Sequence, residues 1–269
     1  MHKHMLEASS VTNARIAYSA NARIRNMIAR IGRTEDIKFS PTNDSLAILD
    51  YFGKCIYLFS VQLENSATYL SVNLTDYSII TSESLHETHG VAFLGNNHII
   101  VCNRSGDVCI FKIPLPNERP HNLPLEPRAR IRGNGLFRAK VITPGSVDCY
   151  QISKDCYRVL VCNNSWNIIT SHLITLGNAI NIRHEGILIE QQLRIPDGVS
   201  ISNDGAWIAV SNHVDGEVLI YENSPHLSRA TPPSANLRGI VCGLDPKKWT
   251  PRHPASCSNA MGERYPKLE

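Results

Sequence analysis

The segment from Ile195 to Tyr221, IPDGVSISNDGAWIAVSNHVDGEVLIY, constrains the fold more than any other part of the chain. It contains three short runs with the apolar–polar alternation of β-strands, separated by Asn203-Asp204-Gly205 and by Asp215-Gly216. Asp and Gly tolerate the positive φ that tight hairpin turns require. The segment therefore predicts a three-stranded antiparallel meander, which can satisfy its edges and bury both faces only by stacking on similar units.

Three upstream segments, 36–59, 88–111 and 146–173, repeat the order strand, turn, strand, turn, strand. The four copies align on the ends of their second strands, at intervals of 52, 60 and 49 residues. A period near 50 residues fits the four-stranded blade of a β-propeller. The alignment positions are Leu49, Val101, Val161 and Val210. The segments expected to supply the fourth strands are Ala67 to Val72, Leu136 to Ile142, Ile187 to Leu193 and Leu237 to Val241.

We therefore predict an all-β protein: a single β-propeller domain over residues 35–244, with four clear blades and at most a partial fifth. Residues 1–34 alternate in a way that fits either a strand or one helix face, and we favour a strand that helps to close the ring. Residues 245–269 are expected to be an irregular tail. An incomplete ring exposes an apolar face of its end blade, so we expect that face to be covered by the N-terminal segment or through self-association at an open edge.

Proline shapes the connection between the second and third copies. Five prolines stand between Pro114 and Pro127, and we expect this stretch to cross the surface without regular structure.

Charge and hydropathy exclude several classes of partner. The net charge is +3, and no cluster of Lys and Arg is interleaved with aromatic residues, so nucleic acid is not an expected partner. No segment approaches the ~20 apolar residues that span a bilayer. The first ten residues also lack the apolar core of a secretory signal. We therefore expect a cytoplasmic protein that does not act at a membrane.

Cysteine usage agrees with that compartment. There are eight cysteines but no C-x-x-C pair, and six of them lie in or beside expected strands. We expect these six to be reduced, apolar strand residues and not parts of a disulfide framework or a zinc site. They are Cys55, Cys102, Cys109, Cys149, Cys156 and Cys162.

Candidate site residues follow from the geometry of a propeller. The innermost strand of each blade begins at the central channel, so residues there converge although they are far apart in sequence. Carboxylates and an imidazole gathered around one axis can bind a hard cation or act as general acid and base. The alternative is that each Asp only caps the turn before its strand. The residues are Glu35, Asp36, His89, Asp148 and Asp197.

Three asparagines form a second candidate set. Asn103, Asn163 and Asn212 each follow a second strand, where they could hydrogen-bond a polar ligand. The alternative is that they only adopt the left-handed or turn conformation that Asn tolerates.

The copies PDGVSISNDGAWIAVSNHVDGEVLIY and THGVAFLGNNHIIVCNRSGDVCIF resemble the repeats of lactonase-like β-propellers, including the surface-layer-type repeat proteins and the regucalcin/gluconolactonase group. This resemblance implies five to seven blades. It also implies a divalent cation held by a Glu near the first blade, an Asn, and the Asp of a Pro-Asp-Gly motif. Glu35 and Asp197 match two of these ligands, whereas His89 and Ser146 stand where the Asn would be expected.

The function we predict is binding of a small polar ligand or a partner protein, without a cofactor, with Asp36 and the three asparagines as ligand contacts. The alternative is a metal-assisted lactone or ester hydrolase, in which Glu35 and Asp197 hold calcium or manganese and His89 and Asp148 are catalytic. A purely structural scaffold is the third reading. Nucleotide chemistry is not expected, because there is no P-loop and Gly133-Asn134-Gly135 lacks the third glycine of a dinucleotide motif.

Overall fold

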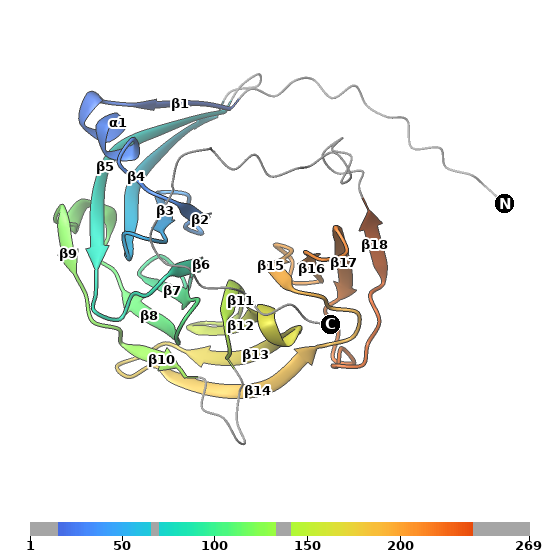
Figure 1. Ribbon diagram of the computed structural model, residues 1–269. Coiled ribbons are helices and arrows are strands. Elements are labelled where there is room, and N and C mark those ends of the chain that lie inside the picture. The colour runs from blue at the N-terminus through green and yellow to red at the C-terminus, as the bar shows by residue number, and fades with distance from the viewer. Residues whose placement is uncertain (1–15, 66–69, 133–140, 239–269) are drawn as a thin grey trace, which may run out of the picture.

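The computed structural model describes residues 16–65, 70–132 and 141–238. They form four antiparallel sheets that stand side by side around a common centre, as Figure 1 shows. We call these sheets blades 1 to 4, in chain order. The first strand of each blade lies nearest to the centre, and successive first strands contact one another. The prediction of an all-β propeller with four clear blades is therefore confirmed.

Each blade contains four strands from the centre outward. Blade 1 has β2 (Thr34–Phe39), β3 (Ser45–Asp50), β4 (Cys55–Asn65) and β5 (Leu70–Thr81). Blade 2 has β6 (Thr88–Phe93), β7 (His98–Asn103), β8 (Val108–Lys112) and β10 (Ala129–Ile131). Blade 3 has β11 (Pro144–Ser153), β12 (Cys156–Asn163), β13 (Ile168–Thr175) and β14 (Asn181–Ile189). Blade 4 has β15 (Pro196–Ile201), β16 (Trp207–Asn212), β17 (Glu217–Glu222) and β18 (Ala235–Arg238).

The first hairpin of every blade uses one residue in the left-handed conformation, which is why Asn, Asp and Gly mark these turns in the sequence. The residues are Asn43, Gly95, Asp155 and Gly205, with φ between 57° and 71°.

The outermost strands differ from the sequence prediction. In blade 2 the outermost strand is β10, and the expected segment Leu136 to Ile142 is wrong where it is described, since Val141 and Ile142 are not in a strand. The expected segments of blades 3 and 4 overlap only the end of β14 and the end of β18. Most residues of these two strands are partly or fully exposed, so they lack the apolar alternation that identifies inner strands. In blade 1 the expected segment Ala67 to Val72 agrees with β5 from Leu70 onward. Residues 67–69 and 239–241 of the expected segments lie outside the described residues.

The hydrophobic core fills the three spaces between neighbouring blades. Blade 2 is covered on both faces, and all six residues of β6 are buried. Among the described residues blade 4 packs against blade 3 alone, so buried residues alternate with more exposed ones along β16. Its other face carries the side chains of Trp207 and Leu237, which are exposed. The alternation that made the fourth copy conspicuous in the sequence thus reflects a blade with one face uncovered in the described part of the chain.

The other end of the arc is covered by the N-terminal segment. β1 (Ile16–Ala20) pairs in parallel with β5, and α1 (Ala22–Ile28) follows, with Asn21 Oδ1 accepting the N–H of Ile24 at 3.0 Å. Ile24 is fully buried in a cluster on the outward face of blade 1. This segment contains a strand, β1, but not the ring-closing strand that we expected, and it also contains α1, whose Ile24, Met27 and Ile28 share one helix face. No helix among the described residues is long and apolar enough to cross a membrane.

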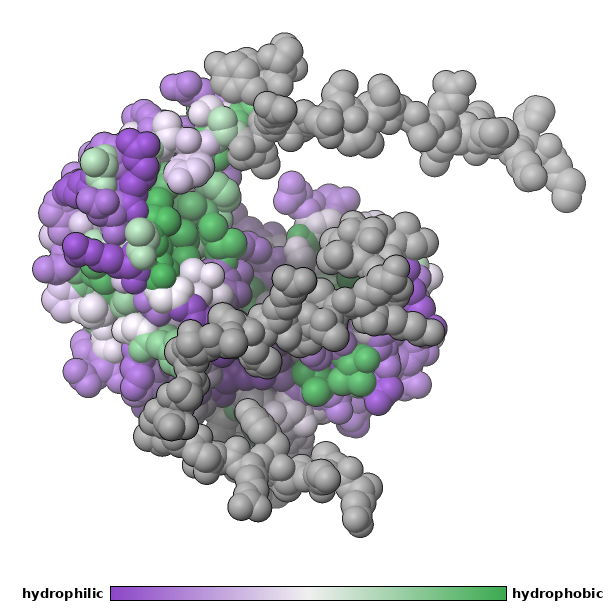
Figure 2. All heavy atoms as spheres, turned by 45° about the horizontal axis from the view of Figure 1, so that its top comes forward, coloured by the Kyte–Doolittle hydropathy of each residue, from purple (hydrophilic) through white to green (hydrophobic). Residues whose placement is uncertain are grey.

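The ring is open in the described part of the chain. No strand of blade 1 pairs with a strand of blade 4, and β1 extends the outer edge of its own blade without closing the ring. Figure 2 shows hydrophobic surface beside this opening. The expected irregular tail, residues 245–269, lies outside the described residues.

The proline-rich connection is more regular than expected. Residues 116–118 form a 3-10 turn, η1 (Pro116–Glu118), and β9 (Asn122–Pro124) pairs in parallel with β5, burying Leu123. The prediction that this stretch has no regular structure is wrong. One of its prolines, Pro124, stands in a strand, at the last position of β9.

All six strand cysteines are free, as predicted. Burial raises the pKa of the Cys149 thiol to about 12 and that of the Cys109 thiol to about 11, so both are protonated near neutral pH.

Candidate functional site

The start of the innermost strand provides one equivalent position per blade. The second residue of this strand is Glu35 in blade 1, His89 in blade 2, Gly145 in blade 3 and Asp197 in blade 4. We call the end of the arc at which these strands begin the mouth end. Because the strands are packed side by side, these four positions lie around one axis, and a residue that is remote in sequence can contact them.

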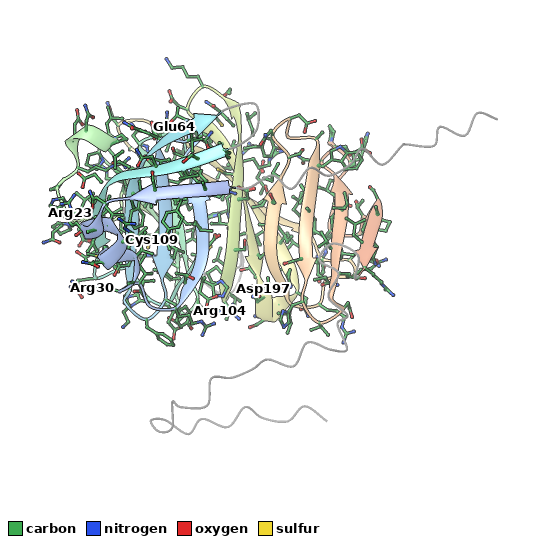
Figure 3. All side chains as sticks on the ribbon, turned by 90° about the horizontal axis from the view of Figure 1, so that it is seen from above. Arg23, Arg30, Glu64, Arg104, Cys109 and Asp197 are labelled. Carbon is green, nitrogen blue, oxygen red and sulfur yellow. The ribbon has the colours of Figure 1, made fainter. Side chains whose placement is uncertain are left out.

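Glu35, His89 and Asp197 are brought together by an arginine that the sequence analysis did not single out. His89 Nε2 lies 3.4 Å from Glu35 Oε2 and 2.9 Å from Arg104 Nη1. The same Arg104 nitrogen lies 3.6 Å from Asp197 Oδ1, to which Asn164 Nδ2 donates at 2.5 Å. Figure 3 shows Arg104 and Asp197 at the same end of the strands. With Arg33, whose Nε pairs with Glu35, these residues form a connected set that we call the mouth cluster: Arg33, Glu35, His89, Arg104, Asn164 and Asp197.

Arg104 and Asn164 are positioned by a repeated turn. The residue before the innermost strand adopts a positive φ in blades 2, 3 and 4, at Glu87, Thr143 and Ile195. Its carbonyl accepts the N–H of the residue after the second strand, for example Arg104 N to Glu87 O at 3.0 Å and Asn164 N to Thr143 O at 3.3 Å. This conformation is costly for β-branched Thr and Ile. Blades 2, 3 and 4 therefore each keep a strained turn that directs one residue toward the mouth end.

The tautomer of His89 follows from its neighbours. Nδ1 lies 2.5 Å from the carbonyl oxygen of Gly145, which can only accept, so Nδ1 carries the proton. Arginine can only donate, so Nε2 accepts an N–H from Arg104 when the ring is neutral. The neutral ring is therefore the Nδ1–H tautomer, and its Nε2 faces the centre of the cluster.

One buried acceptor of the mouth cluster, Asn164 Oδ1, has no hydrogen-bond partner among the described residues. Glu35 Oε1 is ion-paired with Arg33 Nε. An unpaired buried acceptor costs roughly 1–3 kcal/mol, and such groups in native proteins call for an explanation. Gly145 belongs to the same arrangement, because a Cβ there would overlap Asn164 Oδ1 and its amide group.

The three candidate asparagines lie at one repeated structural position. Asn103, Asn163 and Asn212 are almost fully buried, and each Oδ1 accepts the N–H that stands two residues before the innermost strand of its own blade. In blade 1 the carboxylate of Asp50 takes this place, accepting from Gly32 N at 3.1 Å. None of the three asparagines has a positive φ, so the left-handed reading is wrong. A ligand contact by these residues stays a prediction, while the observed contacts are structural.

Asp36 and Asp148 do not join the mouth cluster. Asp148 stands three residues beyond Gly145, which is about 10 Å along an extended strand. Its Oδ1 accepts from Lys38 Nζ at 2.9 Å and its Oδ2 accepts from Ile201 N at 2.8 Å, so it links three blades. Asp36 Oδ2 accepts from the backbone N–H of Val91 at 2.8 Å. Burial raises the pKa of Asp36, although the backbone N–H groups of Val91 and Ile37 donate to its carboxylate and oppose the shift. Both carboxylates connect neighbouring innermost strands.

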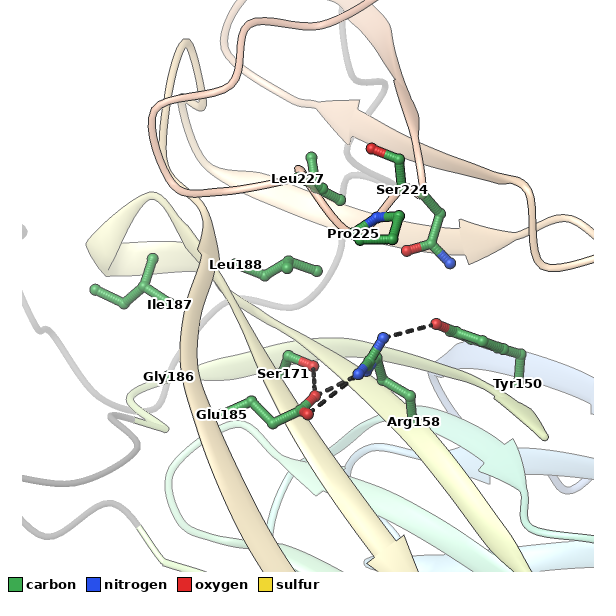
Figure 4. A pocket seen from close by; sticks show the side chains of 11 residues that line it. Tyr150, Arg158, Ser171, Glu185, Gly186, Ile187, Leu188, Ser224, Pro225 and Leu227 are labelled. Atoms are coloured by element: carbon green, nitrogen blue, oxygen red, sulfur yellow. Dashed lines mark hydrogen bonds and ion pairs between the residues drawn. The ribbon is translucent and has the colours of Figure 1, made fainter. Parts of the chain in front are cut away.

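A further hollow of about 510 Å³ lies at the outer side of blades 3 and 4. Figure 4 shows its polar floor, where Arg158 pairs with Glu185 through two nitrogens, at 2.8 and 3.1 Å, and donates to Tyr150 Oη at 3.1 Å. Ser171 also donates to Glu185 at 2.8 Å. These polar groups hydrogen-bond to one another. We therefore attribute the hollow to the packing of blades 3 and 4 and not to a ligand site.

The comparisons with known proteins agree on the fold. No family model matches the sequence, and no curated protein matches it. Among solved structures, a candidate 6-phosphogluconolactonase of Bacteroides uniformis is 12% identical, with a TM-score of 0.51 over 83% of this chain and 59% of its own. One of Bacteroides fragilis is 11% identical, with a TM-score of 0.50 over 77% of this chain and 55% of its own.

The chain therefore has a β-propeller fold like that of these two proteins, and it spans a little over half of their length. At such low identity the likeness establishes the fold alone. What the site does must be argued from its own residues.

Proposed function

We propose that this protein binds a small polar ligand at the mouth cluster. The observation that carries the proposal is the buried acceptor Asn164 Oδ1, which has no hydrogen-bond partner among the described residues and belongs to the same cluster as the guanidinium of Arg104. A ligand hydroxyl group would donate to this acceptor, and a carboxylate or carbonyl oxygen would accept from Arg104 or Arg33. Their side chains are 34% and 55% exposed, so both arginines are accessible. A hydroxylated acid or its lactone combines these groups.

A divalent cation fits this cluster poorly. Asn164 does place an amide beside Asp197, which the expected ligand set lacked. However, Arg104 stands between His89 and Asp197, where its positive charge would compete with a metal ion. Over the described ranges, no group of three or more His, Cys, Asp and Glu side chains is arranged to hold a metal. We infer that Arg104 supplies the positive charge of this site, and that calcium or manganese stabilises the fold little.

Hydrolysis of a lactone or ester is the second candidate function, and the geometry of His89 favours it. A ligand carbonyl that takes the N–H groups of Arg104 would leave His89 Nε2 free to accept a proton from water. The carboxylate of Glu35, 3.4 Å from this nitrogen, would stabilise the imidazolium that forms. Asp148 has no role in this reaction, because it lies further along the strand.

Binding can be measured by calorimetry and thermal shift with gluconate, 6-phosphogluconate and glucono-δ-lactone as probes. A ligand at 100 times its Kd stabilises the native state by about 2.7 kcal/mol. We expect this shift for at least one probe, and its loss in Arg104→Gln. The matched control is Arg132→Gln, which changes an arginine that is 69% exposed and lies outside the cluster. No shift with any probe, or an unchanged shift in Arg104→Gln, would refute the proposal.

Two further measurements separate the alternatives. Lactone opening followed by proton release should be faster than the uncatalysed rate, and should fall to that rate in His89→Gln, only if the protein is a hydrolase. Calcium or manganese should leave the melting temperature almost unchanged. A rise of several degrees that disappears in Asp197→Asn would instead establish a metal site.

A further inference from the structure

A second cavity, of about 630 Å³, lies at the end of the arc opposite to the mouth cluster. We call it the far-end cavity. It is lined by the last residues of the innermost strands and by the turns that follow them, and all four blades contribute. Its volume is within the range of small-molecule sites. Convergence of four blades on one polar hollow distinguishes it from the surface depressions between two neighbouring blades.

The far-end cavity has no net charge. Of the described residues that line it, only Lys38 and Asp148 are charged, and they pair with each other at 2.9 Å. Asp148 is nearly buried and uses its second oxygen for Ile201 N, so it offers little to a cationic ligand. A charged ligand would therefore meet no unbalanced opposite charge, and a neutral ligand is favoured.

The free polar groups of the cavity both donate and accept. Gln151, Ser200 and Asn203 line it, are at least partly exposed, and have no side-chain hydrogen-bond partner in the described part of the chain. An amide presents an acceptor oxygen and two N–H donors, and a hydroxyl group presents one donor and two lone pairs. These groups match a ligand whose own polar groups are hydroxyls, since each hydroxyl also donates and accepts.

An exposed aromatic ring completes the recognition surface. Phe39, the last residue of β2, lines the cavity with 38% of its surface exposed. Its strand partner in register is Leu46, and it does not belong to the core between blades 1 and 2. An aromatic ring at the edge of a polar cavity suits a ring-shaped ligand that has one apolar C–H face and a polar rim.

From these observations we propose that the far-end cavity binds a neutral polyhydroxylated ligand, a sugar or a cyclic polyol. The ring stacks on Phe39, and its hydroxyl groups pair with Gln151, Ser200, Asn203 and the ammonium of Lys38. The site is separate from the mouth cluster, because Phe39 and Glu35 are four residues, about 13 Å, apart on one extended strand.

The test uses the full chain and measures binding of glucose, maltose and myo-inositol by calorimetry and ligand-observed NMR. Glucuronate and glucosamine serve as the charged analogues and are measured on Arg104→Gln, because the mouth cluster of the wild type is itself proposed to bind hydroxylated acids. We expect at least one neutral probe to bind with a Kd of about 1 mM or lower, and both charged analogues to bind more weakly. Phe39→Ala and Gln151→Ala should each weaken binding about tenfold. Tyr18→Ala removes another exposed aromatic ring of blade 1, outside both sites, and should leave binding unchanged.

Cross-variants keep this proposal distinct from the mouth cluster. Arg104→Gln should leave sugar binding intact, and Phe39→Ala should leave binding of the acidic probes intact. The proposal is overturned if no neutral probe binds, if glucuronate or glucosamine binds to Arg104→Gln as tightly as glucose does, or if Phe39→Ala and Gln151→Ala both keep the wild-type affinity. A melting temperature close to that of the wild type shows that each variant is folded, as expected for exposed side chains.

Discussion

Replacing Asn103 with alanine tests whether the buried amides at the ends of the second strands stabilise the propeller. Asn103 Oδ1 accepts the N–H of His86 at 2.9 Å, and Nδ2 donates to the carbonyl of Ser84 at 2.8 Å. Asn103 is fully buried and Ser84 is 3% exposed, so water replaces the lost amide poorly. Alanine therefore removes both hydrogen bonds and leaves the two backbone groups without these partners.

The expected magnitude follows from these two contacts. A hydrogen bond contributes about 0.5–1.5 kcal/mol net, and a buried group left unpaired costs about 1–3 kcal/mol. The Cys109 thiol still donates to Ser84 O at 3.7 Å, which offsets part of the loss. We expect Asn103→Ala to lower the free energy of unfolding by about 2–4 kcal/mol. For a chain of this size that is a fall in melting temperature of roughly 4–16 °C.

Urea unfolding followed by circular dichroism measures this free energy, and the acidic and sugar probes measure affinity in the same variant. Asn178→Ala, at an exposed loop position, is the control and should lie within about 0.5 kcal/mol of the wild type. Wild-type stability of Asn103→Ala combined with lost ligand affinity would show that the amide contacts ligand and not the blade. Our reasoning would then be refuted.

Three further variants test other parts of the structure. Gly145→Ala should abolish binding of the acidic probes by calorimetry, because its Cβ overlaps Asn164 Oδ1; unchanged binding would contradict this packing. Ile24→Ala should cost about 2–5 kcal/mol in urea unfolding, and a much smaller loss would mean that α1 does not cover blade 1. Burial raises the pKa of Glu185, but hydrogen bonds, chiefly from Arg158, lower it below 4.5 overall. Its stabilisation is therefore present above pH 4.5 and is lost as the pH falls through the folded pKa, a loss that Glu185→Gln should not show.

The sequence by itself determined the blades, because their signals are local. Each hairpin needs a residue that tolerates positive φ, and Asn43, Asp155 and Gly205 stand at these turns. Inner strands are buried on one or both faces, so their apolar patterns are strong. Outermost strands such as β18 are exposed along their whole length, which removes the pattern and explains why their bounds were predicted poorly.

Part of the candidate site also followed from the sequence. Glu35, His89 and Asp197 occupy the same position of the repeat, so aligning the copies was enough to predict that they converge. Asp148 was assigned to this set although it stands three residues beyond the equivalent position, Gly145. β11 begins at Pro144 and is ten residues long, which puts Gly145 at the mouth end and Asp148 in the middle of the strand.

Only the tertiary structure decided which other side chains complete the cluster. Arg104 and Asn164 follow second strands, in turns whose sequences suggest nothing beyond a reversal of the chain. They meet Asp197 because blades 2, 3 and 4 pack side by side, and contacts between residues 33 or more positions apart leave no periodic signal in a single sequence. The open face of blade 4 and the helix that covers blade 1 depend on the same packing. Turn residues and apolar–polar alternation specify each blade. The packing of the blades against one another determines which side chains meet at the mouth end.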